Sequence, residues 1–286
     1  MPDPNLPEPV AEDSLVQGTE ASVPAAPPPS LQPAKEDPPW NGVDVIVLAT
    51  VVALSVFLIT PLAVTIAILL HVDGVSAGAS ASHQIPALLS DVRVLLPAQL
   101  MVYLVALVFM VQIVRRRYGA DFLPAIKWNW PAGHWPRFVL VGVVLAFAIS
   151  VLTLFLPETK NLPIDTLFQG RRSAFLMAGF GILVAPFMEE LFFRGFLYPV
   201  LVRKMGMFWA VALTAIAFTG IHVSQLAASW APLLVLLCVG VVLTLVRAST
   251  QSVAASVLAH MGYNSALFAM LYFGTQGFRH LDQVTK

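Results

Sequence analysis

Residues 45–70 read VIVLATVVALSVFLITPLAVTIAILL, a stretch in which no side chain carries a charge. A helix needs about 20 mostly apolar residues to cross the hydrocarbon core of a bilayer. The stretch is long enough to do so, and it is too long for the apolar region of a cleavable signal peptide. We therefore expect it to remain in the chain as a membrane-spanning helix.

Similar apolar stretches recur along the rest of the chain, at 94–114, 137–156, 173–200, 207–223, 231–247 and 251–274. The stretch 173–200 is interrupted by polar residues, and Pro186 marks a place where it could break, because proline lacks a backbone donor. The pattern predicts an all-α fold, a polytopic transmembrane bundle of about seven helices, with six to eight as the range.

The composition agrees with a membrane protein. Hydrophobic residues make up 58% of the chain and charged residues 11%, whereas about a quarter of an ordinary soluble chain is charged. Sixteen Lys and Arg balance sixteen Asp and Glu, so no net charge attracts nucleic acid, and the lipid bilayer is the expected surrounding. The single cysteine, Cys238, excludes an internal disulfide and a zinc site made of cysteines.

The apolar stretches divide the chain into four parts. Residues 1–40 are rich in Pro, Ala and acidic residues and are expected to be a disordered tail. Residues 41–170 hold the N-terminal transmembrane helices and an interfacial segment rich in tryptophan. Residues 171–276 form the core that carries the polar motifs, and residues 277–286 are a short tail.

Basic residues near the helix ends predict the orientation in the membrane. The loop after the second stretch carries five of them and should be cytoplasmic, namely Arg115, Arg116, Arg117, Lys127 and Arg137. Alternation then puts the N-terminus in the cytoplasm, although Arg171 and Arg172 fall on the outer side. We expect an integral multi-pass protein, in the inner membrane if the source is bacterial.

The fourth stretch contains three charged residues, Glu189, Glu190 and Arg194, among bulky apolar neighbours. One charge at the centre of a membrane helix costs roughly 2.5–3.5 kcal/mol, so such residues need partners or a polar cavity. Glu190 and Arg194 stand four apart and should form a structural ion pair. Glu189 points about 100° away from Glu190, so its carboxylate is the one left for chemistry.

Two further polar pairs lie on later stretches. Phe218 and His222 are four apart, as are His260 and Asn264, so each pair shares one face of its helix. Counted from the expected cytoplasmic end of each helix, Glu189, His222 and Asn264 lie roughly 21–22 Å into the membrane and His260 roughly 15 Å. Similar depth is what a shared cavity requires. Phe218 is expected to pack rather than react.

These three motifs, Glu-Glu-x-x-x-Arg, Phe-x-x-x-His and His-x-x-x-Asn, resemble those of the CAAX prenyl endopeptidase and bacteriocin-processing family of intramembrane proteases, which includes abortive-infection proteins. The resemblance covers roughly residues 173–274. It implies an intramembrane peptidase acting on a peptide or protein substrate, which is prenylated in eukaryotic members. It implies that Glu189 activates water, that His222 holds this water, and that His260 and Asn264 stabilise the oxyanion.

Two matters stay open at this point. Either the glutamate alone activates the water, with no cofactor, or zinc does so, held by Glu189, His222 and His260 with water in the fourth position. The same polar cluster would also serve a non-proteolytic scaffold or an immunity protein that binds a partner. A transporter with a proton relay is disfavoured, because the sequence shows no inverted repeat.

Overall fold

A computed structural model of the chain describes residues 37–70, 85, 87–159, 162–168 and 170–281. These residues belong to one compact unit, Glu36–Lys286. The expected N-terminal tail therefore lies outside the described residues up to position 36, and so do residues 282–286. Within the expected tail, Trp40 is wholly buried, so the packed part of the chain includes residues before position 41.

The described residues form helices and no strands, which confirms the all-α bundle. Six helical ranges are long and apolar enough to cross a membrane. They are α1 (Gly42–Leu69), α3 (Val92–Gln112) with its π-helical end η1 (Ile113–Arg117), α5 (Trp135–Thr153), the continuous range Arg171–Gly220, α9 (Trp230–Thr250) and α10 (Val253–Gly274). Two short elements join them, α4 (Phe122–Ala125) and the 3-10 helix η2 (Pro163–Phe168).

The range Arg171–Gly220 is built from five consecutive segments. They are α6 (Arg171–Gly179), the π-helix η3 (Phe180–Val184), α7 (Ala185–Glu190), the π-helix η4 (Leu191–Leu197) and α8 (Tyr198–Gly220). The chain stays helical through Pro186, which lies in the first turn of α7, directly after the π-helical segment η3. The break considered near Pro186 is therefore absent, and π-helix flanks α7 on both sides.

This long range folds back on itself at Gly206. The glycine has a φ of 79°, a left-handed conformation that favours glycine over other residues. As a result, Phe193 before the turn and Phe218 after it meet edge to face, with ring centroids 5.4 Å apart. The range thus supplies two arms, which agrees with the separate stretches 173–200 and 207–223 expected from the sequence.

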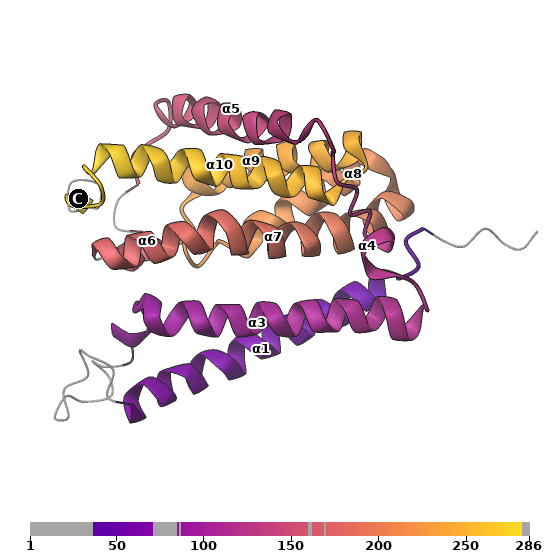
Figure 1. The fold of residues 1–286 in the computed structure, drawn as a ribbon, viewed down its shortest axis with the longest axis horizontal. Coiled ribbons are helices and arrows are strands. Elements are labelled where there is room, and N and C mark those ends of the chain that lie inside the picture. Colours follow the sequence, from indigo (N-terminus) through magenta and orange to yellow (C-terminus); the bar gives the residue numbers. More distant parts are fainter. Residues whose placement is uncertain (1–36, 71–84, 86, 160–161, 169, 282–286) are drawn as a thin grey trace, which may run out of the picture. The chain divides into compact units, whose positions relative to one another are not determined.

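Helix α10 lies at the centre of the bundle. Within their most apolar stretches, 61% of α10 is buried in the protein against 11% of α1. Figure 1 shows α10 between α5 on one side and α6 and α7 on the other, with α9 alongside. Ser252 caps its first turn by accepting from the Ala255 amide at 3.0 Å.

Two glycines let α5 and α10 approach backbone to backbone. A Cβ on Gly142 of α5 would overlap the carbonyl oxygen of Ala259, and a Cβ on Gly262 of α10 would overlap that of Val139. Small residues at such crossings are typical of membrane helices, whose association depends on close packing. The contact fixes the part of α10 that carries His260.

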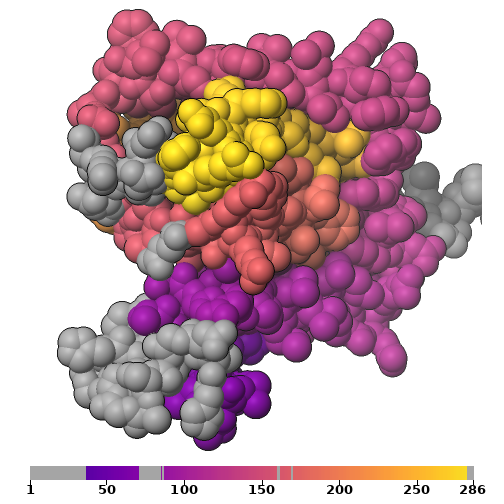
Figure 2. Space-filling model, turned by 60° about the vertical axis from the view of Figure 1, so that its left-hand side comes forward, coloured from indigo at the N-terminus to yellow at the C-terminus, as the bar shows by residue number. Residues whose placement is uncertain are grey.

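Helices α1 and α3 pack together, and they lie on the side of α6 and α7 that faces away from α10 (Figure 1). Figure 2 shows the same order, with α6 between α10 and α3. One end of the pair is fastened by the buried Asp44, which accepts from Arg117 Nη1 at 2.8 Å and from the Tyr118 hydroxyl at 2.5 Å. Burial and this hydrogen bond raise the pKa of Tyr118, so its phenol keeps the proton that Asp44 accepts.

A short strap, Asp37–Asn41, joins the start of α1 to the motif-bearing helices. The indole of Trp40 stacks on Phe196 of η4 with ring centroids 4.6 Å apart, and its Nε1 donates to the Phe196 carbonyl at 2.8 Å. Arg203 Nη2 donates to the Trp40 carbonyl at 2.9 Å, and Lys127 pairs with Asp37 at 3.0 Å. The strap therefore contacts the first arm of the range Arg171–Gly220 and the segment that follows α4.

Candidate active site

Glu190 is fully buried and has three polar partners. Its Oε1 accepts from Arg194 Nη1 at 2.7 Å and contacts His260 Nδ1 at 2.9 Å, and its Oε2 accepts from the Ser256 hydroxyl. The ion pair expected from the spacing of Glu190 and Arg194 is present. A buried carboxylate is stable only when its charge and lone pairs are satisfied, and here they are.

Arg194 is also fully buried, and each of its nitrogens has an acceptor. Nη2 donates to the Gly240 carbonyl at 2.9 Å, and Nε donates to the Thr244 hydroxyl at 3.2 Å. Its guanidinium also lies over the ring of Phe218, 4.7 Å from the centroid. The pair thus ties η4 to α9, while Phe218 packs against it as expected.

His260 links this pair to the second carboxylate. A carboxylate only accepts hydrogen bonds when it is ionised, so the contact with Glu190 assigns a proton to Nδ1 of the ring. The other ring nitrogen, Nε2, then faces Glu189, whose Oε2 lies 3.9 Å away. Glu190 therefore fixes the ring orientation that directs Nε2 toward Glu189.

Glu189 has a more open setting than its neighbour. Its side chain is 12% exposed, whereas that of Glu190 is not exposed at all. Tyr103 of α3 is also near enough to Glu189 for an electrostatic interaction between the two side chains. Glu189 is thus the less buried of the two adjacent carboxylates.

His222 and Asn264 lie at the edges of this group. His222 follows the end of α8, and its Nδ1 lies 2.9 Å from the carbonyl of Phe218, so Nδ1 is the donor and Nε2 is left as an acceptor. Phe218 stands between the two histidines, with ring centroids 5.0 Å from His222 and 5.8 Å from His260. Asn264 donates through Nδ2 to the Gly181 carbonyl in η3 at 2.6 Å.

Direct contacts therefore join Glu189, Glu190, Arg194 and His260. His222 is linked to them through Phe218, and Asn264 stands one turn beyond His260 on the same helix. The described part of the chain contains no group of three His, Cys, Asp or Glu side chains arranged to hold a metal ion. Glu189, His222 and His260 do not form such a group in this part of the chain.

Several residues of this site carry no motif that the sequence would reveal. Ser256 stands one turn before His260 on the same face, and that spacing is the one signal that could have pointed to it. Thr244 and the Gly240 carbonyl come from α9, which carries none of the three motifs. Tyr103 comes from α3, far away in the sequence.

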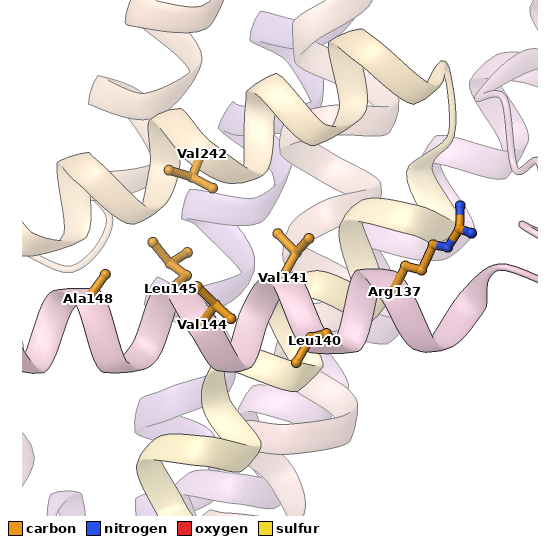
Figure 3. A pocket seen from close by; sticks show the side chains of 7 residues that line it. All are labelled: Arg137, Leu140, Val141, Val144, Leu145, Ala148 and Val242. Atoms are coloured by element: carbon orange, nitrogen blue, oxygen red, sulfur yellow. The ribbon is translucent and has the colours of Figure 1, made fainter.

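A groove elsewhere in the molecule is lined by none of the motif residues. It lies between α5 and α9, has a volume of about 520 Å³ and opens widely to the outside (Figure 3). Apolar side chains line it, with one cation at its end; they are Leu140, Val141, Val144, Leu145, Ala148, Val242 and Arg137. Its apolar lining suits contact with lipid tails.

Comparison with known proteins bears on the segment that holds the site. Residues 171–266 match the family described as Type II CAAX prenyl endopeptidase Rce1-like. Searches of the curated proteins and of the solved structures gave no match. The matched segment contains all three motifs and every residue predicted to act in the site. Over residues 171–266, this integral, multi-pass membrane protein is therefore similar to the Rce1-like, type II CAAX prenyl endopeptidase family, which is a family of proteases.

Proposed function

We propose that this protein is an intramembrane endopeptidase in which Glu189 activates the water that attacks a peptide bond. The observation that carries the proposal is the contrast between two adjacent carboxylates. The carboxylate of Glu190 has hydrogen-bond partners in Arg194, Ser256 and His260. Glu189 is instead partly exposed and faces the Nε2 edge of the His260 ring. A general base has to keep such an open side for the proton that it takes.

The proposed first step is attack of water on the scissile carbonyl carbon. Glu189 takes one proton of the water as the new C–O bond forms, and Nε2 of His222 accepts the other O–H as a hydrogen bond. This role suits His222, because its Nδ1 is already engaged with the Phe218 carbonyl. General base catalysis of this kind contributes about 10²–10⁴-fold to the rate.

Negative charge then develops on the carbonyl oxygen, which needs donors in a site that excludes water. His260 donates from Nε2 when its ring is in the imidazolium form, with Glu190 and Glu189 as the neighbouring negative charges. Asn264 contributes its second amide N–H, since the first is bound to the Gly181 carbonyl. The C–N bond breaks when Glu189 returns its proton to the leaving amine.

The proposed substrate is a protein or peptide with a prenylated C-terminal CAAX-type sequence. The description of the family supports this substrate class. The lipid-facing surface of the protein also suits a substrate that carries a hydrocarbon chain, because large apolar side chains such as Phe57, Phe155 and Phe273 are more than 70% exposed.

The decisive experiment replaces Glu189 with Gln in the purified, full-length protein. A farnesylated CAAX-type peptide and its unprenylated counterpart are the probes, and release of the C-terminal fragment is measured. We expect about a 1,000-fold loss of kcat, because the amide cannot take a proton from water. Glu158→Gln is the matched control, since it makes the same change in an exposed loop.

Two results would overturn the proposal. Full cleavage by Glu189→Gln would remove the base from the mechanism. If the parent protein cut neither peptide, and the Glu189→Gln variant supported normal function in cells, the non-proteolytic scaffold would be favoured.

A further inference from the structure

The apolar groove between α5 and α9 follows one face of α5 (Figure 3). The residues of α5 that line it recur every three or four positions from Arg137 to Ala148, as side chains on one face of a helix do. The adjacent face of α5 carries Gly142, Ala146 and Ile149, which are buried in the bundle. The groove therefore lies beside the packed seam of the helices and not within it.

The length of the groove matches one leaflet of a bilayer. Arg137 and Ala148 are eleven positions apart, and a helix rises about 1.5 Å per residue, so the lining covers about 16 Å along α5. The hydrocarbon core of a bilayer is about 30 Å thick, so one leaflet contributes about 15 Å. One acyl chain of a phospholipid therefore fits the groove from end to end.

The charged end of the groove lies at the level expected for lipid headgroups. Arg137 is the single charged residue of the lining, its side chain is exposed, and it forms an ion pair with no acidic side chain among the described residues. Figure 3 shows it leaving α5 on the same side as Val141 and Leu145. Trp135, two positions earlier, is 48% exposed, and indoles favour the headgroup level.

We propose that this groove binds one anionic phospholipid, whose phosphate pairs with the Arg137 guanidinium and whose acyl chain lies along α5 against Val242 of α9. Basic pockets between transmembrane helices on the cytoplasmic side bind anionic headgroups, and the loop that leads to Arg137 is expected to be cytoplasmic. The lining offers no carboxylate to the amine of a zwitterionic headgroup. An anionic headgroup is therefore the better match.

The prenyl chain of a substrate fits this groove less well. In a short CAAX-type sequence the prenyl group lies close to the bond that is cut, so its chain has to start near Glu189. Helix α10 lies between α5 and α7, which carries Glu189 (Figure 1). The groove is thus a site for a lipid of the membrane, and the inference does not depend on the proposed function.

A lipid in the groove also contacts the helix that holds the buried ion pair. Val242 lies on α9 between Gly240 and Thr244, which accept hydrogen bonds from Arg194. A ligand that binds the folded protein and not the unfolded chain raises the thermal midpoint. Occupation of the groove should therefore stabilise the bundle against heat.

The test uses the purified full-length protein in micelles of a neutral detergent. The protein is titrated with a phosphatidylglycerol or with a phosphatidylcholine that has the same acyl chains. The thermal midpoint at each lipid fraction gives an apparent affinity, and native mass spectrometry counts the lipids that stay bound. We expect phosphatidylglycerol to bind about fivefold more tightly, which is the effect of one arginine near a membrane surface.

Arg137→Gln tests the charged end of the groove. The variant should bind phosphatidylglycerol about fivefold more weakly than the parent does and should no longer distinguish the two lipids, because the cation is absent. Arg116→Gln is the matched control, since it removes another exposed arginine that does not line the groove. Its affinity for phosphatidylglycerol should equal that of the parent.

Val144→Trp tests the apolar part. Val144 is 58% exposed, so a larger side chain fills the groove without entering the core, and the variant should retain no phosphatidylglycerol in the mass spectrum. Val151→Trp is its control, because Val151 is 56% exposed on the same helix outside the lining. A lipid-free thermal midpoint close to that of the parent shows that each variant is folded.

Three results would overturn the inference. Equal affinity of the parent for the two lipids would mean that Arg137 selects no anionic headgroup. Equal losses in Arg137→Gln and Arg116→Gln would assign the preference to the general surface charge. Retention of phosphatidylglycerol by Val144→Trp would place the acyl chain elsewhere. Peptide cleavage is measured in none of these arms, so failure of the proposed role of Glu189 would leave them unchanged.

Discussion

Glu189 and Glu190 are neighbours in the chain, yet they lie in two regions with opposite properties. On the side of Glu190, Arg194, Ser256, Thr244 and His260 form a closed polar network with no exposed carboxylate. On the side of Glu189, the contacts are longer and the carboxylate is partly open. A buried charge can be held rigidly or left available, and adjacent residues on a helix can do both because they face different directions.

The closed network also serves the open side. Glu190 accepts a hydrogen bond from Nδ1 of His260, and this contact directs Nε2 of the ring toward Glu189. The residue expected to be a structural partner of Arg194 therefore also positions a proposed catalytic ring. The three predictions below change one side of this comparison at a time.

The largest effect is expected from Glu190→Gln. This change leaves the guanidinium of Arg194 buried without a carboxylate, and breaking a buried pair in this way costs about 3–5 kcal/mol. The free energy of unfolding in mixed micelles measures it. Glu189→Gln replaces a partly exposed carboxylate that lies 3.9 Å from His260, so it should lower stability by less than about 1 kcal/mol. Equal losses at the two positions would mean that the two regions do not differ as described.

A smaller effect is expected from Trp40→Phe. Phenylalanine keeps a ring against Phe196 but loses the indole N–H that donates to the Phe196 carbonyl, a bond worth about 1 kcal/mol. Unfolding in the same micelles checks the prediction, with Trp130→Phe as a control because Trp130 is 56% exposed. If Trp40→Phe were as stable as the parent, the strap would not brace the η4 segment that carries Arg194.

The smallest effect is expected from metal removal. Because Glu189, His222 and His260 are not grouped to hold an ion, peptide cleavage should be unchanged after dialysis against 1,10-phenanthroline. The rate is compared with the metal content of the same sample. Loss of cleavage that zinc restores would show that the open side binds a metal after all.

The sequence predicted those features that depend on short spacing. Apolar stretches located the spans, the separation of four predicted the Glu190 to Arg194 pair, and the polar interval around Gly206 separated the two arms. Helical periodicity is local, so these inferences do not need the tertiary structure. The predicted roles of His222 and Asn264 stay predictions, because their contacts are with Phe218 and Gly181 and not with Glu189.

Contacts between distant segments could not be predicted in this way. Tyr103 carries no motif, and an aromatic residue in an apolar helix usually packs. Trp40 lies in a Pro-rich stretch that looks like a tail, yet it is fully buried. The link between Glu190 and His260 spans 70 residues, so similar depth suggested proximity but could not say which nitrogen faces which carboxylate.

The strap has a consequence for the order in which the protein is made. Trp40 precedes its partner Phe196 by 156 positions, and ribosomes add about 5–20 residues per second. Phe196 is therefore synthesised about 8–30 s after Trp40, when α1, α3 and α5 have already been produced. Until then, the Trp40 indole has no Phe196 ring on which to stack. The segment is thus among the first of the described residues to leave the ribosome, yet it cannot reach its buried position until Phe196 has been synthesised.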